Sequence, residues 1–162
     1  RYIMERWSLL CYTCSRCNTS RITMQRYLYF RTEATDANDD ATGDSACYPA
    51  SSLMGMQPTA DSALTLYFKP IVRRTPSGNE PDADASFDNH DAVILNLTTA
   101  NTHLTAMKAI THAITTGRAF NSGTVLPALI IIANDDSGGT EYLANSGISA
   151  CSVITVNVAY AN

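Results

Sequence analysis

Three cysteines near the start of the chain have the spacing of metal ligands. Cys11, Cys14 and Cys17 are each separated by two residues, a spacing at which thiolates hold zinc or an iron–sulfur cluster. Both kinds of site need a fourth ligand, which zinc sites usually supply as a second close pair. The other cysteines, Cys47 and Cys151, stand alone, and no H-x-x-x-H pair follows. The ligand set is incomplete, so no metal site is predicted at these cysteines, and no cofactor is predicted for the chain.

The first 23 residues differ in composition from the rest of this 162-residue chain. They hold four arginines against one acid, three of the five cysteines and the only Trp. Their net charge is +3 and that of the whole chain is −4, so residues 24–162 carry −7. We interpret residues 1–23 as an extension that is artefactual or disordered. A single globular domain is predicted for residues 24–162, beginning at Met24.

The acidic charge of this domain excludes some classes of partner. Duplex binding normally needs a basic patch, so no nucleic-acid partner is expected. No uninterrupted apolar stretch reaches the roughly 18 residues of a membrane-spanning helix, so no membrane partner is expected either.

The chain has several acidic candidates for a metal site. Asp135 and Asp136 follow the apolar run at 128–133, a place where magnesium ligands often lie in open sheets. The alternative is a hairpin turn through residues 137–139, because Asp, Asn and Gly are the residues that tight turns require. We favour the turn and keep both aspartates as weak metal candidates. The acidic segments 36–44 and 82–88 lack the Gly and Glu positions of a calcium loop.

Hydrophobic periodicity predicts several strands and one helix. Alternation of apolar and polar residues favours strands at 26–32, 63–69, 92–98 and 148–160. Residues 128–133 are apolar on both faces, which is typical of a central strand. Residues 47–61 carry two prolines and are expected to form a short extended piece followed by a packed loop. The helix is expected at 99–117, ending at Gly117. Its predicted buried stripe is Leu104, Met107, Ile110 and Ile114, with Lys108 and Thr111 exposed.

These elements predict an α+β fold, a mainly antiparallel β-sheet of five or more strands with one amphipathic helix packed on one face. A helix about 10 Å wide cannot cover five strands spaced at about 4.8 Å. The uncovered face would carry aromatic and apolar side chains, which a second copy of the chain would bury. The predicted oligomer interface consists of Tyr27, Tyr29, Tyr67 and Ile94.

Motifs of catalysis are missing from the sequence. There is no G-x-S-x-G elbow, phosphate loop or dinucleotide fingerprint. His103 and His112 would lie on opposite sides of the helix and cannot share a ligand. We therefore predict a protein that is not an enzyme.

The order of several short segments resembles a group of known proteins. "RYLYFRTEA", "YPASSLMGM", "LTLYFKP", "VILNLTTANTHLTAMKAITHAI", "LIIIAND" and "ISACSVITVNV" follow one another within residues 24–162. This order resembles small uncharacterised or virion structural proteins of marine tailed phages, notably those infecting cyanobacteria. The resemblance implies a non-enzymatic virion structural or assembly accessory protein that acts as a homo-oligomer, with other virion proteins as further partners. It also implies a location in the virion or in the cytoplasm of an infected bacterial host.

A second hypothesis remains open at this point. The chain could be a small-molecule or divalent-metal-binding module, with or without enzymatic activity, that uses the acidic loops near 134–136. A site assembled from distant residues leaves no local signature in a sequence.

Overall fold

The computed structural model describes residues 25–71 and 90–158. The predicted extension at 1–23, including its three cysteines, lies outside the described residues, as does the acidic segment 82–88. The described residues form two four-stranded sheets and a single α-helix, α1 (His103–Thr116). Two short 3-10 helices lie between the early strands, at Asp36–Asn38 and Ala50–Ser52.

The first sheet, sheet A, has the strand order β2-β1-β6-β7. Its central pair, β1 with β6, is parallel, and the two outer pairs are antiparallel. Its strands are β1 (Tyr27–Arg31), β2 (Ser45–Pro49), β6 (Leu129–Asn134) and β7 (Glu141–Tyr142).

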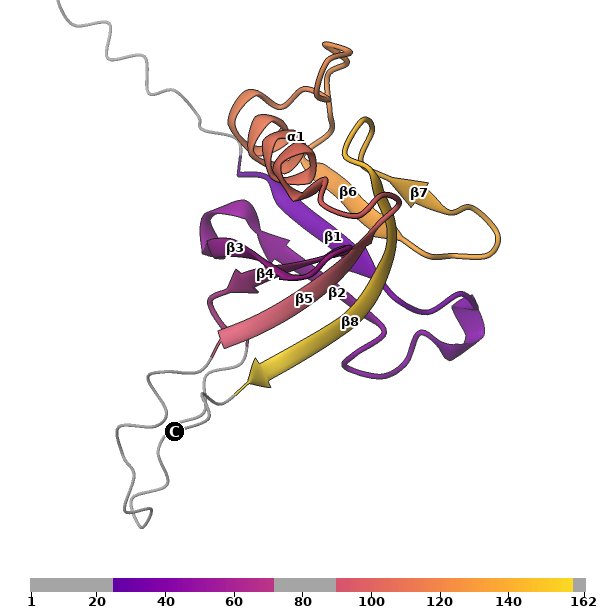
Figure 1. The fold of residues 1–162 in the computed structure, drawn as a ribbon. Coiled ribbons are helices and arrows are strands. Elements are labelled where there is room, and N and C mark those ends of the chain that lie inside the picture. The colour runs from indigo at the N-terminus through magenta and orange to yellow at the C-terminus, as the bar shows by residue number, and fades with distance from the viewer. Residues whose placement is uncertain (1–24, 72–89, 159–162) are drawn as a thin grey trace, which may run out of the picture.

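The second sheet, sheet B, has the order β3-β4-β5-β8 and is antiparallel throughout. Its last strand is long and curved, and it approaches β1, β6 and β7 of sheet A (Figure 1). Its strands are β3 (Leu53–Ala60), β4 (Ala63–Phe68), β5 (His90–Leu97) and β8 (Ile148–Val158).

The core lies between the inner faces of the two sheets. Tyr48 of sheet A stacks on Phe68 of sheet B with ring centroids 4.2 Å apart, and Phe30 meets Phe68 edge to face at 5.7 Å. All three side chains are fully buried, as are Leu66 and Leu95 on the sheet B side. Alternate residues along each strand point inward, so each sheet buries one face against the other.

The helix closes one end of this two-sheet arrangement (Figure 1). At its first residue, the His103 ring Nε2 lies 2.9 Å from the carbonyl oxygen of Ala60, at the end of β3. Near its last turn, Arg26 Nη1 donates to the carbonyl of Ile114 at 2.7 Å, directly before β1 begins. Gly117 ends the helix in the left-handed region at φ 66°, as predicted. A side chain there would meet the Arg26 guanidinium.

The predicted fold class is confirmed in its main features. The fold is α+β, the strand pairs are antiparallel with one exception, and one α-helix is present among the described residues. The expectation of one sheet with five or more strands is wrong, because the strands divide into two sheets of four. Period-2 alternation shows that a strand buries one face, but not whether a helix or another sheet covers it.

The predicted buried stripe of the helix is partly wrong. Ile110 is fully buried, but Leu104 is 63% exposed, and Met107 and Ile114 are half-buried at the margin of the core. The buried face is made mainly of small residues at three- and four-residue steps, which allow the helix backbone to approach the sheets closely. Lys108 is exposed, as predicted. The buried residues of α1 are Ala106, Ala109, Ile110 and Ala113.

Candidate functional site

The four residues of the predicted oligomer interface do not share one face. Tyr27 and Tyr29 lie on β1 in sheet A, whereas Tyr67 and Ile94 lie on β4 and β5 in sheet B. Their neighbours along each strand are buried between the sheets, so the four side chains point outward on two different sides. The single face that was expected to carry all of them is therefore corrected to two separate outer faces.

The first outer face carries a contiguous apolar surface on sheet A. Tyr27 is the register partner of Leu129, and Tyr29 is the partner of Ile131. Tyr27 is 40% exposed and Leu129 45% exposed, and the other two are half-buried. We call Tyr27, Tyr29, Leu129 and Ile131 the sheet A patch.

A second apolar surface lies on the outer face of sheet B. Ile94 is the register partner of Val153, which is 42% exposed. Tyr67 lies diagonally across from Ile94 on β4, since its own partner in β5 is Ala92. We call Tyr67, Ile94 and Val153 the sheet B patch.

Asp135 and Asp136, the weak metal candidates, follow β6 but have separate hydrogen-bond partners. Asp135 Oδ1 accepts from the Tyr142 hydroxyl at 2.8 Å, and its Oδ2 accepts from the backbone N–H of Cys151 at 2.9 Å. Asp136 Oδ1 accepts from the backbone N–H of Gly138 at 2.8 Å. The antiparallel pairing of β6 with β7 shows that this segment is the hairpin turn favoured by the sequence.

The Asp135 carboxylate connects the two sheets. Cys151 lies at a register shift in β8, where Ile94 pairs with Val153 but Leu95 pairs with Cys151. Burial, with the nearby Asp135 carboxylate adding to it, raises the pKa of the Cys151 thiol to about 12. Burial and then the hydrogen bond to Asp135 raise the pKa of Tyr142 to about 12. The Cys151 thiol and the Tyr142 hydroxyl are therefore both neutral beside this carboxylate at physiological pH.

Asp136 belongs to a cluster around the buried Arg31 guanidinium. Arg31 Nη1 lies 2.6 Å from Asp36 Oδ1 and 3.6 Å from Asp136 Oδ2, and its Nε lies 3.7 Å from Asp39 Oδ2. The hydrogen bond to Asp36 is the main reason that the pKa of Arg31 is raised. The positively charged Arg31 guanidinium therefore already occupies the space between these three carboxylates. In residues 25–71 and 90–158, no group of three or more His, Cys, Asp and Glu side chains could hold a metal ion.

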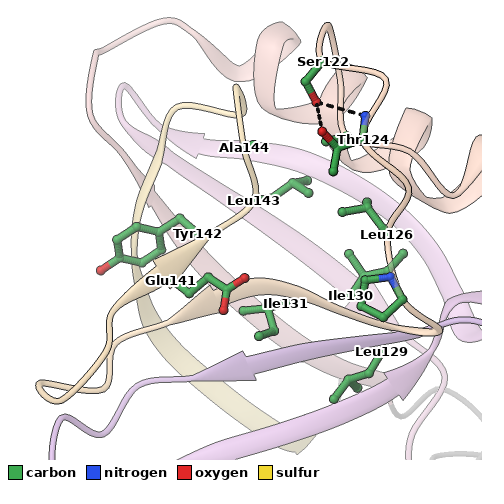
Figure 2. Close-up of a pocket in the computed structure, with 12 residues that line it drawn as sticks. Ser122, Thr124, Leu126, Leu129, Ile130, Ile131, Glu141, Tyr142, Leu143 and Ala144 are labelled. Carbon is green, nitrogen blue, oxygen red and sulfur yellow. Dashed lines mark hydrogen bonds between the residues drawn. The ribbon is translucent and has the colours of Figure 1, made fainter.

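A pocket of about 320 Å³ lies beside β6, on the outer side of sheet A. Figure 2 shows Leu126 and Leu143 directed toward each other across it, with Leu129 and Ile131 along the strand. The lining is mostly apolar, and Glu141 is the one charged side chain among the described residues that line it. The remaining lining residues are Ala119, Ser122, Thr124, Pro127, Ile130, Tyr142 and Ala144.

Two segments hold the walls of this pocket in place. The loop after α1 folds on itself through Ala119 N–H to the Thr124 carbonyl at 2.8 Å, and Leu126 N–H donates to the Gly117 carbonyl at 2.8 Å. The turn after β7 is tied to that loop, because Asn145 Nδ2 donates to the Phe120 carbonyl at 2.7 Å. These hydrogen bonds therefore fix the walls of the pocket, which lies between the loop after α1, β6 and β7.

The chemistry of the pocket favours binding over catalysis. The hydroxyl groups of Ser122 and Thr124 hydrogen-bond to each other at 3.2 Å, and the Tyr142 hydroxyl donates to Asp135. Among the described residues, no histidine, cysteine or lysine lines it. Sequence reasoning missed this site, because its residues come from separate segments and only the apolar run at 128–133 pointed toward it.

Comparison with protein-family models, with curated proteins and with solved structures found no match for this chain. Among the helices that the structure describes, none is long and apolar enough to cross a membrane. The functional interpretation therefore depends on the geometry of the chain itself.

Proposed function

We propose that this chain is a non-enzymatic assembly protein that acts as a homo-oligomer through its outer sheet faces. The observation that carries the proposal is the presence of apolar patches on the outer faces of both sheets. Tyr27, Leu129 and Val153 are each at least 40% exposed. Exposed apolar patches on a folded domain mark sites of association.

The composition of the two patches suits a protein interface. Tyrosines bury a large apolar ring while the hydroxyl keeps a hydrogen bond, which is why they are enriched in interface cores. Two patches that face different ways allow one subunit to contact two neighbours. Contacts of a patch with its own copy give a closed dimer, whereas contacts between different patches give a ring or an open filament.

The resemblance to small proteins of marine tailed phages supports a narrower proposal, in which the assembly is a virion component or an accessory factor for virion assembly. Mass spectrometry of purified virions would test this narrower proposal. Detection only in the unassembled lysate would favour an accessory role, and absence from both would contradict it.

The alternative of a divalent-metal module near Asn134–Asp136 has less support. Asp135 accepts two hydrogen bonds from the protein, and Asp136 faces Arg31. Calorimetry separates the two hypotheses. Heat on adding calcium or magnesium, lost when Asp135 and Asp136 are both changed to Ala, would favour the metal module.

Light scattering coupled to size exclusion tests self-association directly. The unmodified protein should elute with a whole multiple of the protomer mass. The double change Tyr27→Glu with Tyr29→Glu, or Tyr67→Glu with Ile94→Glu, should lower that mass by placing charge in one patch. Thr111→Glu is the matched control, because it adds a charge on an exposed helix position away from both patches.

Two outcomes would contradict the proposal. One is a monomer for the unmodified protein at micromolar concentration. The other is an oligomer whose mass changes with neither double variant, although circular dichroism shows that both variants are folded.

A further inference from the structure

The edge of β6 that faces the pocket is only partly paired. β7 is two residues long and pairs with Ala133 and Asn134 of β6. One more bond follows, from Leu143 N–H to the Ile132 carbonyl at 3.1 Å. Within the residues that the structure describes, no strand continues beside the first half of β6 on that side.

The register of the parallel pair shows which backbone groups of β6 point to this open side. Tyr27 N–H donates to the Ala128 carbonyl at 2.8 Å, and Tyr27 is level with Leu129. In a parallel ladder, alternate residues of a strand bond to the same neighbour, so Ala128 and Ile130 bond to β1. The N–H and C=O groups of Leu129 and Ile131 therefore point away from β1, toward the pocket.

The pocket is a slot in line with β7. Its base is the open edge of β6, and its sides are the loop after α1 and the end of β7 (Figure 2). Residues 129–131 offer about 10 Å of strand edge, at about 3.3 Å per residue. The loop after α1 and the end of β7 flank this edge, which favours one extended segment over the edge of a second folded sheet.

We propose that this slot binds an extended peptide segment of another protein, which adds to β6 as a short strand. The open N–H and C=O groups of Leu129 and Ile131 bond to the backbone of the peptide, as in other cases of strand addition. Alternate apolar side chains of the peptide enter the space lined by Leu126 and Leu143. The slot adjoins the sheet A patch and shares Leu129 and Ile131 with it, but the inference uses the backbone edge of these residues and does not depend on self-association.

The charge at the slot indicates the residue type that the peptide carries beside it. Glu141 is the one charged residue of the lining, it is exposed, and no ion pair involves it among the described residues. The whole chain also carries a net charge of −4. A Lys or Arg next to the apolar positions of the peptide complements this carboxylate.

Selection from a random library of linear peptides on the full-length chain tests the proposal. The selected peptides should alternate apolar residues and carry Lys or Arg at one flank. The best one, made synthetically with a fluorescent label, is then titrated by fluorescence polarisation. A library that yields no binding peptide, or only helical or acidic ones, would overturn the proposal.

A pair of variants at Leu129 isolates the backbone contribution. Leu129→Pro removes the outward N–H, and proline is tolerated at the first residue of a strand and where the N–H faces away from the ladder. Leu129→Ala removes most of the side chain but keeps the N–H. The proline variant should bind the peptide about three- to tenfold more weakly than the alanine variant, the effect expected for one backbone hydrogen bond. Equal affinities for the two would contradict strand addition.

Two further measurements keep the test decisive if Leu129→Pro unfolds the chain. Methylating single backbone nitrogens of the peptide should weaken binding at every second position, because only alternate residues face β6. Hydrogen exchange at Leu129 and Ile131 should slow when the peptide binds to the unmodified protein. If methylation at every position has the same effect, or exchange at both amides is unchanged, the peptide binds in another way.

The charge contact is tested by Glu141→Lys, with Glu141→Gln as the neutral control. The charge reversal in Glu141→Lys should weaken the binding of a basic peptide by up to about fivefold, which is the range for an exposed ion pair. The neutral change should have a smaller effect, and added salt should reduce the difference. Tighter binding of the same basic peptide to the lysine variant would contradict the assigned orientation.

Discussion

Replacing Asp135 tests whether its carboxylate holds the two sheets together. In Asp135→Ala, the Tyr142 hydroxyl and the Cys151 backbone N–H both lose their acceptor, which lay 2.8 Å and 2.9 Å away. Cys151 is only 3% exposed, so water replaces the lost acceptor poorly there. A hydrogen bond to a charged group contributes about 1.5–3 kcal/mol, and a buried donor without a partner costs about 1–3 kcal/mol. Because Asp135 is half-buried, we expect a loss of about 2–4 kcal/mol in the free energy of unfolding.

Two other variants show whether this loss of stability comes from the hydrogen bonds of the Asp135 carboxylate. Asp135→Asn keeps the shape and one carbonyl acceptor for Cys151, and its amide can donate to the Tyr142 oxygen. It should therefore cost about 1 kcal/mol. Asp136→Ala is the matched control, since this neighbouring carboxylate accepts one turn hydrogen bond and lies 3.6 Å from Arg31. Its loss should be about 1 kcal/mol or less.

The assay is equilibrium unfolding in urea followed by circular dichroism, with all variants compared at one pH and salt concentration. The midpoint should shift without a change in slope, which would show that stability and not compactness has changed. If Asp135→Ala stays within about 0.5 kcal/mol of the unmodified protein, the range of ordinary surface changes, the carboxylate does not connect the sheets. Equal losses for the two alanine variants would refute the reasoning in the same way.

Three further changes test the core, the thiol and the helix end. Ile110→Ala should cost about 2–5 kcal/mol by urea unfolding, whereas the exposed Lys108→Ala should cost about 0.5 kcal/mol or less; similar costs would mean that the buried face of α1 is misassigned. The Cys151 thiol should contribute a fall of about 1 kcal/mol in stability from about pH 8 to about pH 10, because the unfolded thiol (pKa 9.0) ionises there and the folded one, near 12, does not. Cys151→Ala should reduce the slope of stability against pH by this contribution, and an unchanged slope would contradict the assignment. Gly117→Ala should lower the free energy of unfolding by about 2–3 kcal/mol, because φ is positive there and the Arg26 guanidinium is adjacent. Gly123→Ala, at φ 69° in open space, should cost only about 1 kcal/mol. Equal melting temperatures for the two variants would show that the guanidinium contact does not matter.

Strict local alternation identified β1, β4, β5 and β8, whereas β6 was identified from its continuous apolar run. Leu64, Leu66 and Phe68 of β4 are all fully buried, as their period of two indicates. β3 was missed as a strand, because Gly55 and Pro58 interrupt its pattern and 47–61 was interpreted as a short extended piece followed by a packed loop. It lies at the edge of sheet B, where proline is tolerated since one side of the strand needs no partner.

The division into two sheets could not be predicted, because it depends on pairings between distant segments. β1 pairs with β6, from the opposite half of the chain, in a parallel arrangement. Alternation in Tyr27–Arg31 indicates which residues turn inward, and it is the same whether a helix or a second sheet covers them. The expected common face for the four interface residues was wrong for this reason.

The pocket shows that an apolar run in the sequence does not by itself mean that both faces of the strand are buried. Residues 128–133 were expected to form a strand central in its sheet, because they are apolar on both faces, and β6 does lie between β1 and β7. Its inward residues, Ile130 and Ile132, are buried between the sheets, but Leu129 is 45% exposed. The outward residues face a pocket that exists because β7 ends after two residues. An apolar outer face on a strand with one open edge is what a site for an added strand requires, since the side chains supply apolar contact and the backbone supplies direction.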